Sequence, residues 1–173
     1  GGKRCSSPRE AAENSGMILT MLPNSPQVKE VLMGKNGVLE GMKPGSIVVD
    51  MSSIDPGVSV ELEKAVSAAG GEMIDAPVSG GEPKAKDATL SFMCGGKEEV
   101  FAQVKPVLEK MGASVVLTGP IGSGNMTKLA NQIIVAVNIA ALSEALVLAA
   151  KSGVNPENVY NAIKGGLAGS TVM

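Results

Sequence analysis

Short apolar runs alternate with amphipathic segments along the first half of the chain. The apolar runs cover residues 17–22, 46–51 and 72–78; each is bounded by Pro, Gly or Ser and has the length of a strand buried on both faces. Ser-Pro and Asp-Pro dipeptides open helices predicted over residues 25–33 and 55–69, with the Ser and the Asp as N-caps and each proline in the first turn. Three buried strands joined by helices predict a parallel sheet with right-handed crossovers.

The pattern changes after the third apolar run. Only about ten residues separate residue 78 from the next strand-like run, residues 89–94, and a crossover to a parallel neighbour needs more, so we expect an antiparallel strand there. An amphipathic helix over residues 97–111 and a β-branched strand over residues 114–117 follow. The first part of the chain therefore predicts an α/β fold with a mostly parallel sheet.

The last third of the chain carries no strand pattern. A glycine-rich turn leads into a long apolar helix over residues 125–151, and Asn155 followed by a proline starts a second helix. The change from alternating to all-helical structure predicts a domain boundary near residue 120. An α/β domain would then occupy residues 1–120, and the start of an all-helical domain would occupy residues 121–173.

The long helix is apolar on almost every side. Its longest uninterrupted apolar run is residues 145–150, because Asn, Gln, Ser and Glu residues interrupt the remainder. A membrane-spanning helix needs about 20 predominantly apolar residues. We therefore expect no membrane partner, and we expect this helix to be buried against protein.

Composition argues against several functions. The net charge of −2, the pI near 5.3 and the scattered Lys and Arg residues give no basic stripe, so we expect no nucleic-acid partner. Cys5 and Cys94 lie far apart without a CxxC partner, which favours free thiols in a reducing compartment, the cytoplasm, over a disulfide or a metal site. No secretory signal is recognisable and the chain does not begin with Met, so we expect a piece of a longer protein.

One face of the long helix gathers candidate chemistry. Lys128, Asn131 and Gln132 are spaced i, i+3 and i+4, which places a cation and two amides on the same face. The chain contains no His, so acid–base chemistry near neutral pH would fall to Lys, a carboxylate, Cys or the single Tyr. On spacing alone, the same three residues would equally serve as the solvated end of a core helix.

Polar loops follow each of the three parallel strands. Ligands of open α/β sheets bind at the carboxyl ends of the strands, so Pro23-Asn24-Ser25, Ser52-Ser53 and Ser79-Gly80-Gly81 should line one crevice. In the third loop, two glycines let backbone N–H groups approach a carboxylate or phosphate closely, and the hydroxyl adds a donor. Ordinary turns would use the same residues, and the dinucleotide fingerprint GxGxxG occurs nowhere in the sequence.

Three motifs occur together in this chain: Met21-Leu22-Pro23-Asn24, Asp75-Ala76-Pro77-Val78-Ser79-Gly80-Gly81 and Gly124-Asn125-Met126-Thr127-Lys128-Leu129-Ala130-Asn131-Gln132. Together they resemble the β-hydroxyacid dehydrogenase family over essentially the entire chain. Glu82-Pro83-Lys84-Ala85 and the segment from Gly165 to Val172 are most similar to the branch that reduces tartronate semialdehyde to glycerate. The 6-phosphogluconate dehydrogenases are less similar, because their lysine motif carries a His-Asn pair where this chain has Asn131-Gln132.

The resemblance implies a Rossmann-type, NAD(P)-binding domain over residues 1–120 without its first βαβ unit, then an interdomain helix and the start of an all-α domain that forms homo-oligomers. It implies NAD(H) or NADP(H) as cofactor and a small carboxylate-bearing aldehyde or hydroxy acid as substrate. Carried over residue by residue, it assigns catalysis to Lys128 and Asn131, substrate binding to Ser79, Gly80, Gly81 and Asn131, and cofactor binding to Met21, Leu22, Pro23, Asn24 and Ser53.

The activity implied is NAD(P)H-dependent reduction of a small semialdehyde acid, with Lys128 as general acid and base. A lysine beside the carbonyl oxygen stabilises the negative charge that hydride transfer creates, and partial burial should lower its pKa by about 2–3 units. Other substrates (3-hydroxyisobutyrate, succinic semialdehyde or glyoxylate), a non-catalytic dimerising relative, and a nucleotide-binding domain with other chemistry are the alternatives. Because the family's glycine fingerprint and its second, downstream lysine are absent, we expect the 173 residues to be inactive alone.

Overall fold

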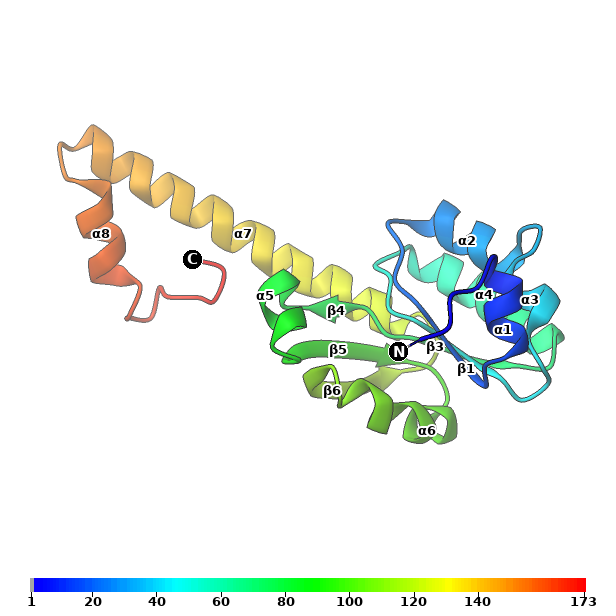
Figure 1. Cartoon of the computed structure of the whole chain (residues 1–173). Helices are drawn as coiled ribbons and strands as arrows, with labels where there is room; N and C mark the ends of the chain where they lie inside the picture. The colour runs from blue at the N-terminus through cyan, green and yellow to red at the C-terminus, as the bar shows by residue number, and fades with distance from the viewer. Residues whose placement is uncertain (1) are drawn as a thin grey trace. The chain divides into compact units, whose positions relative to one another are not determined.

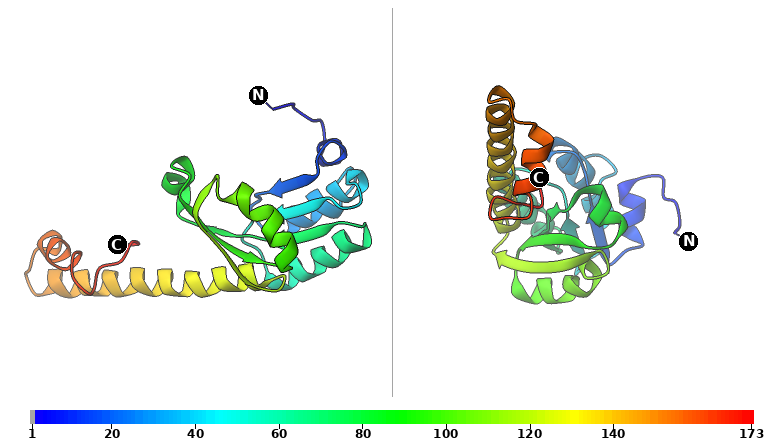
Figure 2. Two further views of the ribbon diagram at one scale, coloured as in Figure 1. Left: turned by 90° about the horizontal axis from the view of Figure 1, so that it is seen from below. Right: turned by 90° about the vertical axis from the view of Figure 1, so that its left-hand side faces the viewer.

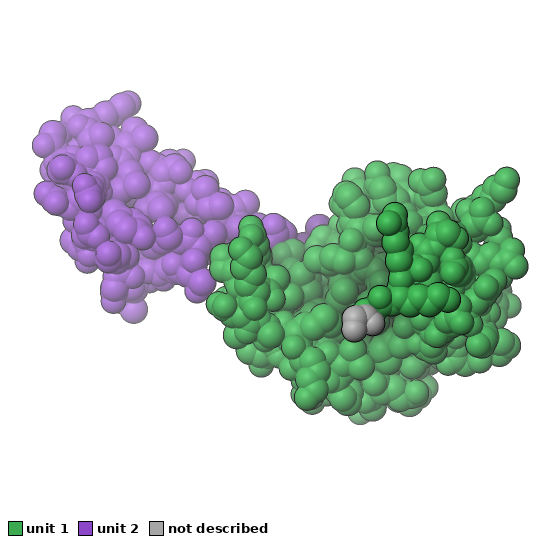
Figure 3. All heavy atoms as spheres, viewed as in Figure 1, with its two compact units in different colours: residues 1–128 green, residues 129–173 purple. Residues whose placement is uncertain are grey.

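The computed structural model describes residues 2–173 and contains two compact units (Figure 3). Unit 1 ends at Lys128 and holds a six-stranded sheet with helices on both faces, and unit 2 holds most of helix α7 and all of α8 (Figure 1). The helices are α1 (Pro8–Glu13), α2 (Ser25–Met33), α3 (Val38–Gly41), α4 (Pro56–Ala68), α5 (Gly81–Lys86), α6 (Glu98–Leu108), α7 (Ser123–Lys151) and α8 (Pro156–Ile163). The strands are β1 (Met17–Thr20), β2 (Ile47–Asp50), β3 (Glu72–Asp75), β4 (Val78–Ser79), β5 (Leu90–Gly95) and β6 (Gly112–Gly119).

The parallel half of the sheet is formed by β1, β2 and β3, which confirms the prediction from the apolar runs. Residues 17–20 pair in register with residues 47–50, and these pair in register with residues 72–75. α4 begins as predicted, with an Asp-Pro pair at its N-terminus. The N-cap of α2 is Asn24 and not Ser25, because Asn24 is the last extended residue and its side chain accepts a hydrogen bond from the Ser25 N–H.

The third apolar run divides into two strands instead of the single one expected. β3 stops at Asp75, and Val78–Ser79 forms β4, which pairs antiparallel with β5. β5 also pairs antiparallel with β3, as predicted, and β6 runs parallel to β5. The short helices α3 and α5 occupy segments expected to be loops, because four to six residues are too few to display a helical period.

Helices cover both faces of the sheet (Figures 1 and 2). Side chains of β2 alternate between two apolar clusters, one on each face. Val48 packs in the cluster that contains Leu62 of α4, whereas Ile47 and Val49 pack in the cluster that contains Val104 of α6. Burying one such side chain stabilises the fold by about 1.5–3 kcal/mol. A strand covered on both faces has no solvent side, which explains why β2 is apolar without interruption until Asp50.

α7 is largely exposed, which corrects the expectation of a protein-buried helix. Its most apolar 18-residue window has a mean hydropathy of 2.2, but only 6% of that window is buried. Ile133, Ile134 and Leu148 are 64–68% exposed. By length and composition the helix could also cross a membrane. Residues 2–173 therefore leave most of this apolar surface uncovered.

Candidate functional site

Three polar side chains form a buried row at the carboxyl ends of the parallel strands. Thr20, Asp50 and Asp75 are register partners on β1, β2 and β3, and each is at most 7% exposed. Asp50 Oδ1 accepts hydrogen bonds from the Thr20 hydroxyl (2.9 Å) and from the Ser52 N–H (3.1 Å). Burial raises the pKa of the Asp50 carboxyl despite these two hydrogen bonds. This row lies at the carboxyl ends of the parallel strands, where open α/β sheets bind ligands.

The loops after β1 and β2, which hold the expected cofactor residues, are tied to each other. The backbone N–H of Leu22 donates to the Ser52 hydroxyl at 2.9 Å, so the Met21–Asn24 segment lies beside the Ser52-Ser53 loop. Met21 is 59% exposed and Ser53 is exposed as well. The cofactor-binding role of Met21 and Ser53 stays a prediction. Asn24 also has a local structural role as the cap of α2.

The Ser79-Gly80-Gly81 segment makes a sharp turn between β4 and α5. Ser79 pairs with Ser91 of β5, and Gly80 and Gly81 have φ values of +137° and +64°, a region that favours glycine. A Cβ added at Gly80 would lie 2.6 Å from Cβ of Lys84, whereas one added at Gly81 would meet only a proline carbon at 3.7 Å. A side chain at Gly80 would therefore collide with α5, whereas the Cβ position of Gly81 is open.

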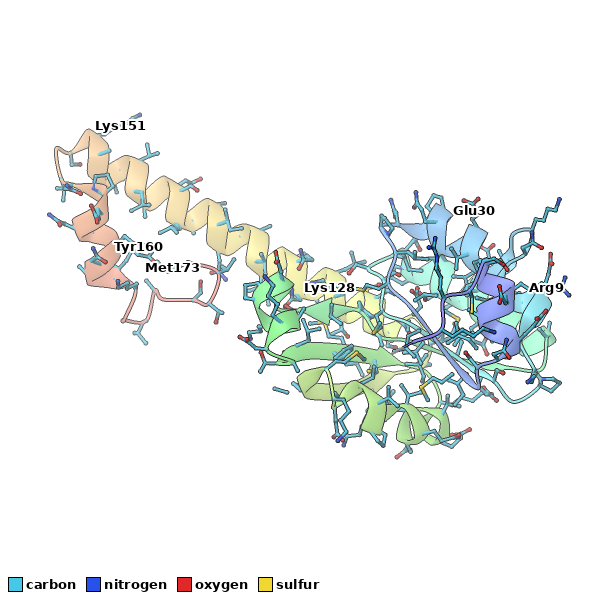
Figure 4. The ribbon with its side chains drawn as sticks, viewed as in Figure 1. Arg9, Glu30, Lys128, Lys151, Tyr160 and Met173 are labelled. Atoms are coloured by element: carbon cyan, nitrogen blue, oxygen red, sulfur yellow. The ribbon has the colours of Figure 1, made fainter. Side chains whose placement is uncertain are left out.

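Lys128 lies on the part of α7 that belongs to unit 1 (Figure 4). Its side chain is half-buried, and its ammonium group makes no hydrogen bond or ion pair with any other residue in the range 2–173. Burial lowers the pKa of Lys128, and no neighbouring charge contributes to the shift. The direction of the expected pKa change is thus confirmed, and its cause is desolvation.

Asp75 joins the start of α7 to the end of β3. Its Oδ1 accepts the N–H of Gly122 and its Oδ2 accepts the N–H of Asn125, both at 2.7 Å. The Asn125 side chain continues the network, since it accepts the N–H of Ile54 at 3.0 Å and donates to the Ser59 hydroxyl at 3.1 Å. All of these groups are buried or lie in backbone, so the network is shielded from water.

The Asp75–Asn125 connection was not found from the sequence. The only available signal was that Asp75 opens one motif and Asn125 lies within another, which is compatible with a contact but does not predict one. Burial raises the pKa of Asp75 to about 6, with a further contribution from the negative charge of Asp50. Cys94 on β5 is also buried, and burial together with Asp75 raises the pKa of its thiol to about 12.

Lys128, Asn131 and Gln132 all lie on the continuous helix α7. Asn131 is half-buried, and its side-chain N–H donates to the Oε1 of Gln132 at 2.9 Å, so the two amides bind each other. Asn131 follows Lys128 by one helical turn but belongs to unit 2. Its roles in substrate binding and catalysis therefore stay predictions. The part of the chain that the structure describes holds no cluster of His, Cys, Asp and Glu suited to a metal ion.

The chain matches two family models that together cover nearly all of it. Residues 1–119 match the NAD-binding domain of 6-phosphogluconate dehydrogenase, and residues 122–173 match the NAD-binding domain of NADP-dependent 3-hydroxyisobutyrate dehydrogenase. Both models describe NAD-binding domains, which agrees with the predicted cofactor, NAD(H) or NADP(H).

Similar proteins bear related names. The chain is 47% identical over 165 residues to 2-hydroxy-3-oxopropionate reductase of Escherichia coli, covering 95% of this chain and 56% of that protein. It is 43% identical over 157 residues to mitochondrial 3-hydroxyisobutyrate dehydrogenase of Mus musculus, covering 91% of this chain and 47% of the relative. A structure of Mycobacterium tuberculosis 3-hydroxyisobutyrate dehydrogenase with L-serine has a TM-score of 0.87 at 32% identity, covering 98% of this chain and 57% of that one.

The chain thus spans about half the length of the curated relatives it matches. Within that half, the sheet, the loops at the carboxyl ends of its strands and the helix that carries Lys128 all lie inside the matched ranges. The chain therefore belongs to the β-hydroxyacid dehydrogenase family and carries its NAD-binding domain.

Proposed function

We propose that the whole protein reduces a small semialdehyde acid with NAD(P)H, and that Lys128 supplies the proton. The observation that carries this proposal is the state of Lys128: a half-buried lysine with a lowered pKa and without an ion-pair partner among residues 2–173. A lysine held only for structure would be expected to lie in solvent or to bind a carboxylate. An uncompensated, partly desolvated cation instead suits a site where negative charge develops.

The reaction needs one hydride and one proton. A bound reduced nicotinamide would supply the hydride to the carbonyl carbon, and the carbonyl oxygen would gain the C=O π electrons. Lys128 Nζ–H then donates its proton to that oxygen, which leaves a neutral amine and an alcohol. A lowered pKa strengthens the ammonium as an acid in this direction and enriches the free amine that acts as base in the reverse direction.

The glycine turn is proposed to hold the substrate's carboxylate. The backbone N–H groups at Gly80 and Gly81 and the hydroxyl of Ser79 offer donors to an anion. Lys84 of α5 adds positive charge nearby along the chain, whereas Lys86 is paired with Glu82 at 2.6 Å. Met21, Leu22, Pro23, Asn24 and Ser53 are proposed to line the nicotinamide side of the cofactor site. Asn131 is proposed to orient the substrate through its amide, which can do so without changing its charge.

Tartronate semialdehyde is the proposed substrate. Support comes from the 47% identity to the E. coli 2-hydroxy-3-oxopropionate reductase and from the two segments flanking the motifs, Glu82–Ala85 and Gly165–Val172. 3-Hydroxyisobutyrate is the second candidate, because the mouse and M. tuberculosis relatives carry that name and L-serine, present in the latter structure, is itself a 3-hydroxy acid. Oxidation rates with glycerate and with 3-hydroxyisobutyrate, compared as kcat/KM, distinguish the two, and reduction of glyoxylate and succinic semialdehyde tests the others.

The test of the lysine uses the full-length protein. Lys128→Ala should lower turnover by roughly 10²–10⁴ while NADH affinity, measured by fluorescence titration, stays the same. Lys151→Ala is the matched control, since Lys151 is an exposed lysine on the same helix. Turnover of the Lys128 variant within about threefold of wild type would remove this residue from the mechanism and would favour a non-catalytic relative of the family.

We also propose that two copies associate through the α-helical region and that the protein works in the cytoplasm. The exposed apolar side chains of α7 support the first point. The second is supported by two free cysteines among the described residues, Cys5 and the buried Cys94, since free thiols are typical of reducing compartments.

A further inference from the structure

The two segments assigned to catalysis and substrate binding are linked inside the protein by one carboxylate. Asp75 ends β3, immediately before the segment that runs from Ala76 to the glycine turn. The same side chain accepts the N–H groups of Gly122, directly before α7, and of Asn125, in its first turn, at 2.7 Å each. Lys128 lies on α7 less than one turn after Asn125. The buried residue Asp75 therefore lies at the start of the backbone that leads to the glycine turn, and its side chain binds the start of the helix that carries Lys128.

The packing around this carboxylate leaves little freedom. A Cβ added at Gly124 would lie 2.7 Å from the carbonyl oxygen of Asp75 and 2.9 Å from its Oδ2, so only glycine allows this approach of α7 to β3. The start of the substrate segment is fixed as well, because the N–H of Ala76 donates to the Asp50 carbonyl at 2.7 Å and the N–H of Met93 donates to the Pro77 carbonyl at 3.0 Å. The substrate segment is thus held by backbone hydrogen bonds, and the start of α7 is held by the Asp75 side chain and by close packing at Gly124.

We propose that Asp75 is a positioning residue of the reductase. By binding the first turn of α7, it fixes the position of Lys128 relative to the Ser79-Gly80-Gly81 turn. The inference rests on the function proposed above. Asp75 is buried and its oxygens are occupied by backbone N–H groups, so it acts through the helix and does not touch substrate. Misplacement of a catalytic group by about 1 Å can cost about 10²-fold in rate, which gives this contact functional weight.

The positioning depends on the charge of Asp75. As a carboxylate it has acceptor capacity on both oxygens for the two N–H groups; a proton on either oxygen weakens one of these bonds. The titratable groups that face it are Asp50 from β2 and Cys94 from β5, whereas α7 contributes backbone N–H groups. With a pKa of about 6, Asp75 is ionised at neutral pH and becomes protonated as the pH falls below 6. Turnover should therefore decline on the acidic side of pH 6.

The first variant is Asp75→Asn in the full-length enzyme. The amide nitrogen of Asn cannot accept an N–H, so one of the two hydrogen bonds to the start of α7 is lost. We expect kcat to fall about 10- to 100-fold, with a smaller rise in the substrate KM and an unchanged KM for NADH. The acidic decline in kcat near pH 6 should disappear. A purely structural role would lower the folded fraction or the melting temperature but would leave the shape of the pH profile intact. Wild-type kcat with an unaltered acidic limb in this variant would overturn the proposal.

The second variant, Asp50→Asn, keeps the test decisive if the first variant fails to fold. The side chain of Asp50 accepts hydrogen bonds from Thr20 and Ser52, and its charge raises the pKa of Asp75, so neutralising it should move the acidic limb of kcat to lower pH. An acidic limb that stays in place would show that Asp75 does not carry it. If Lys128→Ala loses activity while both Asp variants keep the kcat and the pH profile of wild type, only the positioning role is refuted. Full activity of Lys128→Ala would refute the proposed function itself.

Discussion

The side-chain oxygen of Asn125 accepts the backbone N–H of Ile54 at 3.0 Å, which connects the first turn of α7 to the segment between β2 and α4. The Asn125 amide also donates to Ser59 of α4, and Asn125 is only 1% exposed. One residue thus satisfies polar groups from two other elements in a place that water does not reach. Its position in the lysine motif has a structural reason that is separate from chemistry.

Asn125→Ala should lower the free energy of unfolding by about 2–4 kcal/mol. The change leaves the Ile54 N–H without an acceptor, which costs about 1–3 kcal/mol, and it also removes the bond to Ser59. Urea denaturation followed by circular dichroism measures the change. Asn161→Ala on the exposed side of α8 is the control and should shift stability by less than about 0.5 kcal/mol. Equal effects of the two substitutions would contradict this account.

Substitutions in the glycine turn should affect substrate affinity more than turnover. Ser79→Ala should raise the substrate KM with little change in kcat, because an anchor remote from the reacting carbon binds ground and transition states alike. Gly81→Val should raise KM further, since a side chain at φ +64° strains the turn and fills the open space above the N–H.

Gly45→Val is the matched control for the glycine turn. Gly45 has φ +82° and open space around its Cβ position, so the backbone strain is comparable, but it lies between α3 and β2 and takes no part in the proposed site. Its KM should equal that of wild type in steady-state assays. A KM unaltered by Gly81→Val would remove the turn from the substrate site.

Acidification from pH 6 to pH 4 should strengthen the contribution of Asp75 to folding. Its pKa is raised from 3.8 in the unfolded chain to about 6 in the fold, so between these values the folded state binds more protons than the unfolded state. The free energy of unfolding therefore falls as pH rises through this window, by about 2–3 kcal/mol for this group. Urea midpoints at pH 4, 5 and 6 should show a flatter dependence in Asp75→Asn than in wild type. A steeper dependence in the variant would contradict the assigned pKa.

The exposed face of α7 should make the 173-residue chain self-associate. Ile133, Ile134 and Leu148 are more than 60% exposed, and such a surface gains free energy when it is covered. Sedimentation velocity should show a dimer or larger species, and Ile134→Glu should shift it towards monomer. Val116→Glu on β6, at a residue 51% exposed, makes the same change away from α7 and should leave association intact. A chain that is monomeric before substitution would remove this face as the contact.

The parallel strands, α4, α6, α7 and α8 could be predicted because each has a strong local signal, such as the uninterrupted apolar run of β2 or the Asn155 cap of α8. The break between β3 and β4 could not, because Pro77 and Val78 continue an apolar run while the pairing partners lie 12 and 14 residues away on β5. The contact of Asp75 with α7 spans 47 and 50 residues, and no local pattern reports it. The loops after β1 and β2 follow parallel strands as predicted, whereas the Ser79-Gly80-Gly81 turn follows the antiparallel strand β4, which the sequence did not indicate.

The labelling rate of the buried Cys94 thiol reports transient opening of the structure around β5. A thiol with a pKa of about 12 carries almost no thiolate at neutral pH, so a thiol reagent can label it only when β5 separates from its neighbours. Cys5 is partly exposed and reacts without such an opening. The ratio of the labelling rate of Cys94 to that of Cys5 therefore measures how often the structure opens near Asp75. It needs no engineered probe.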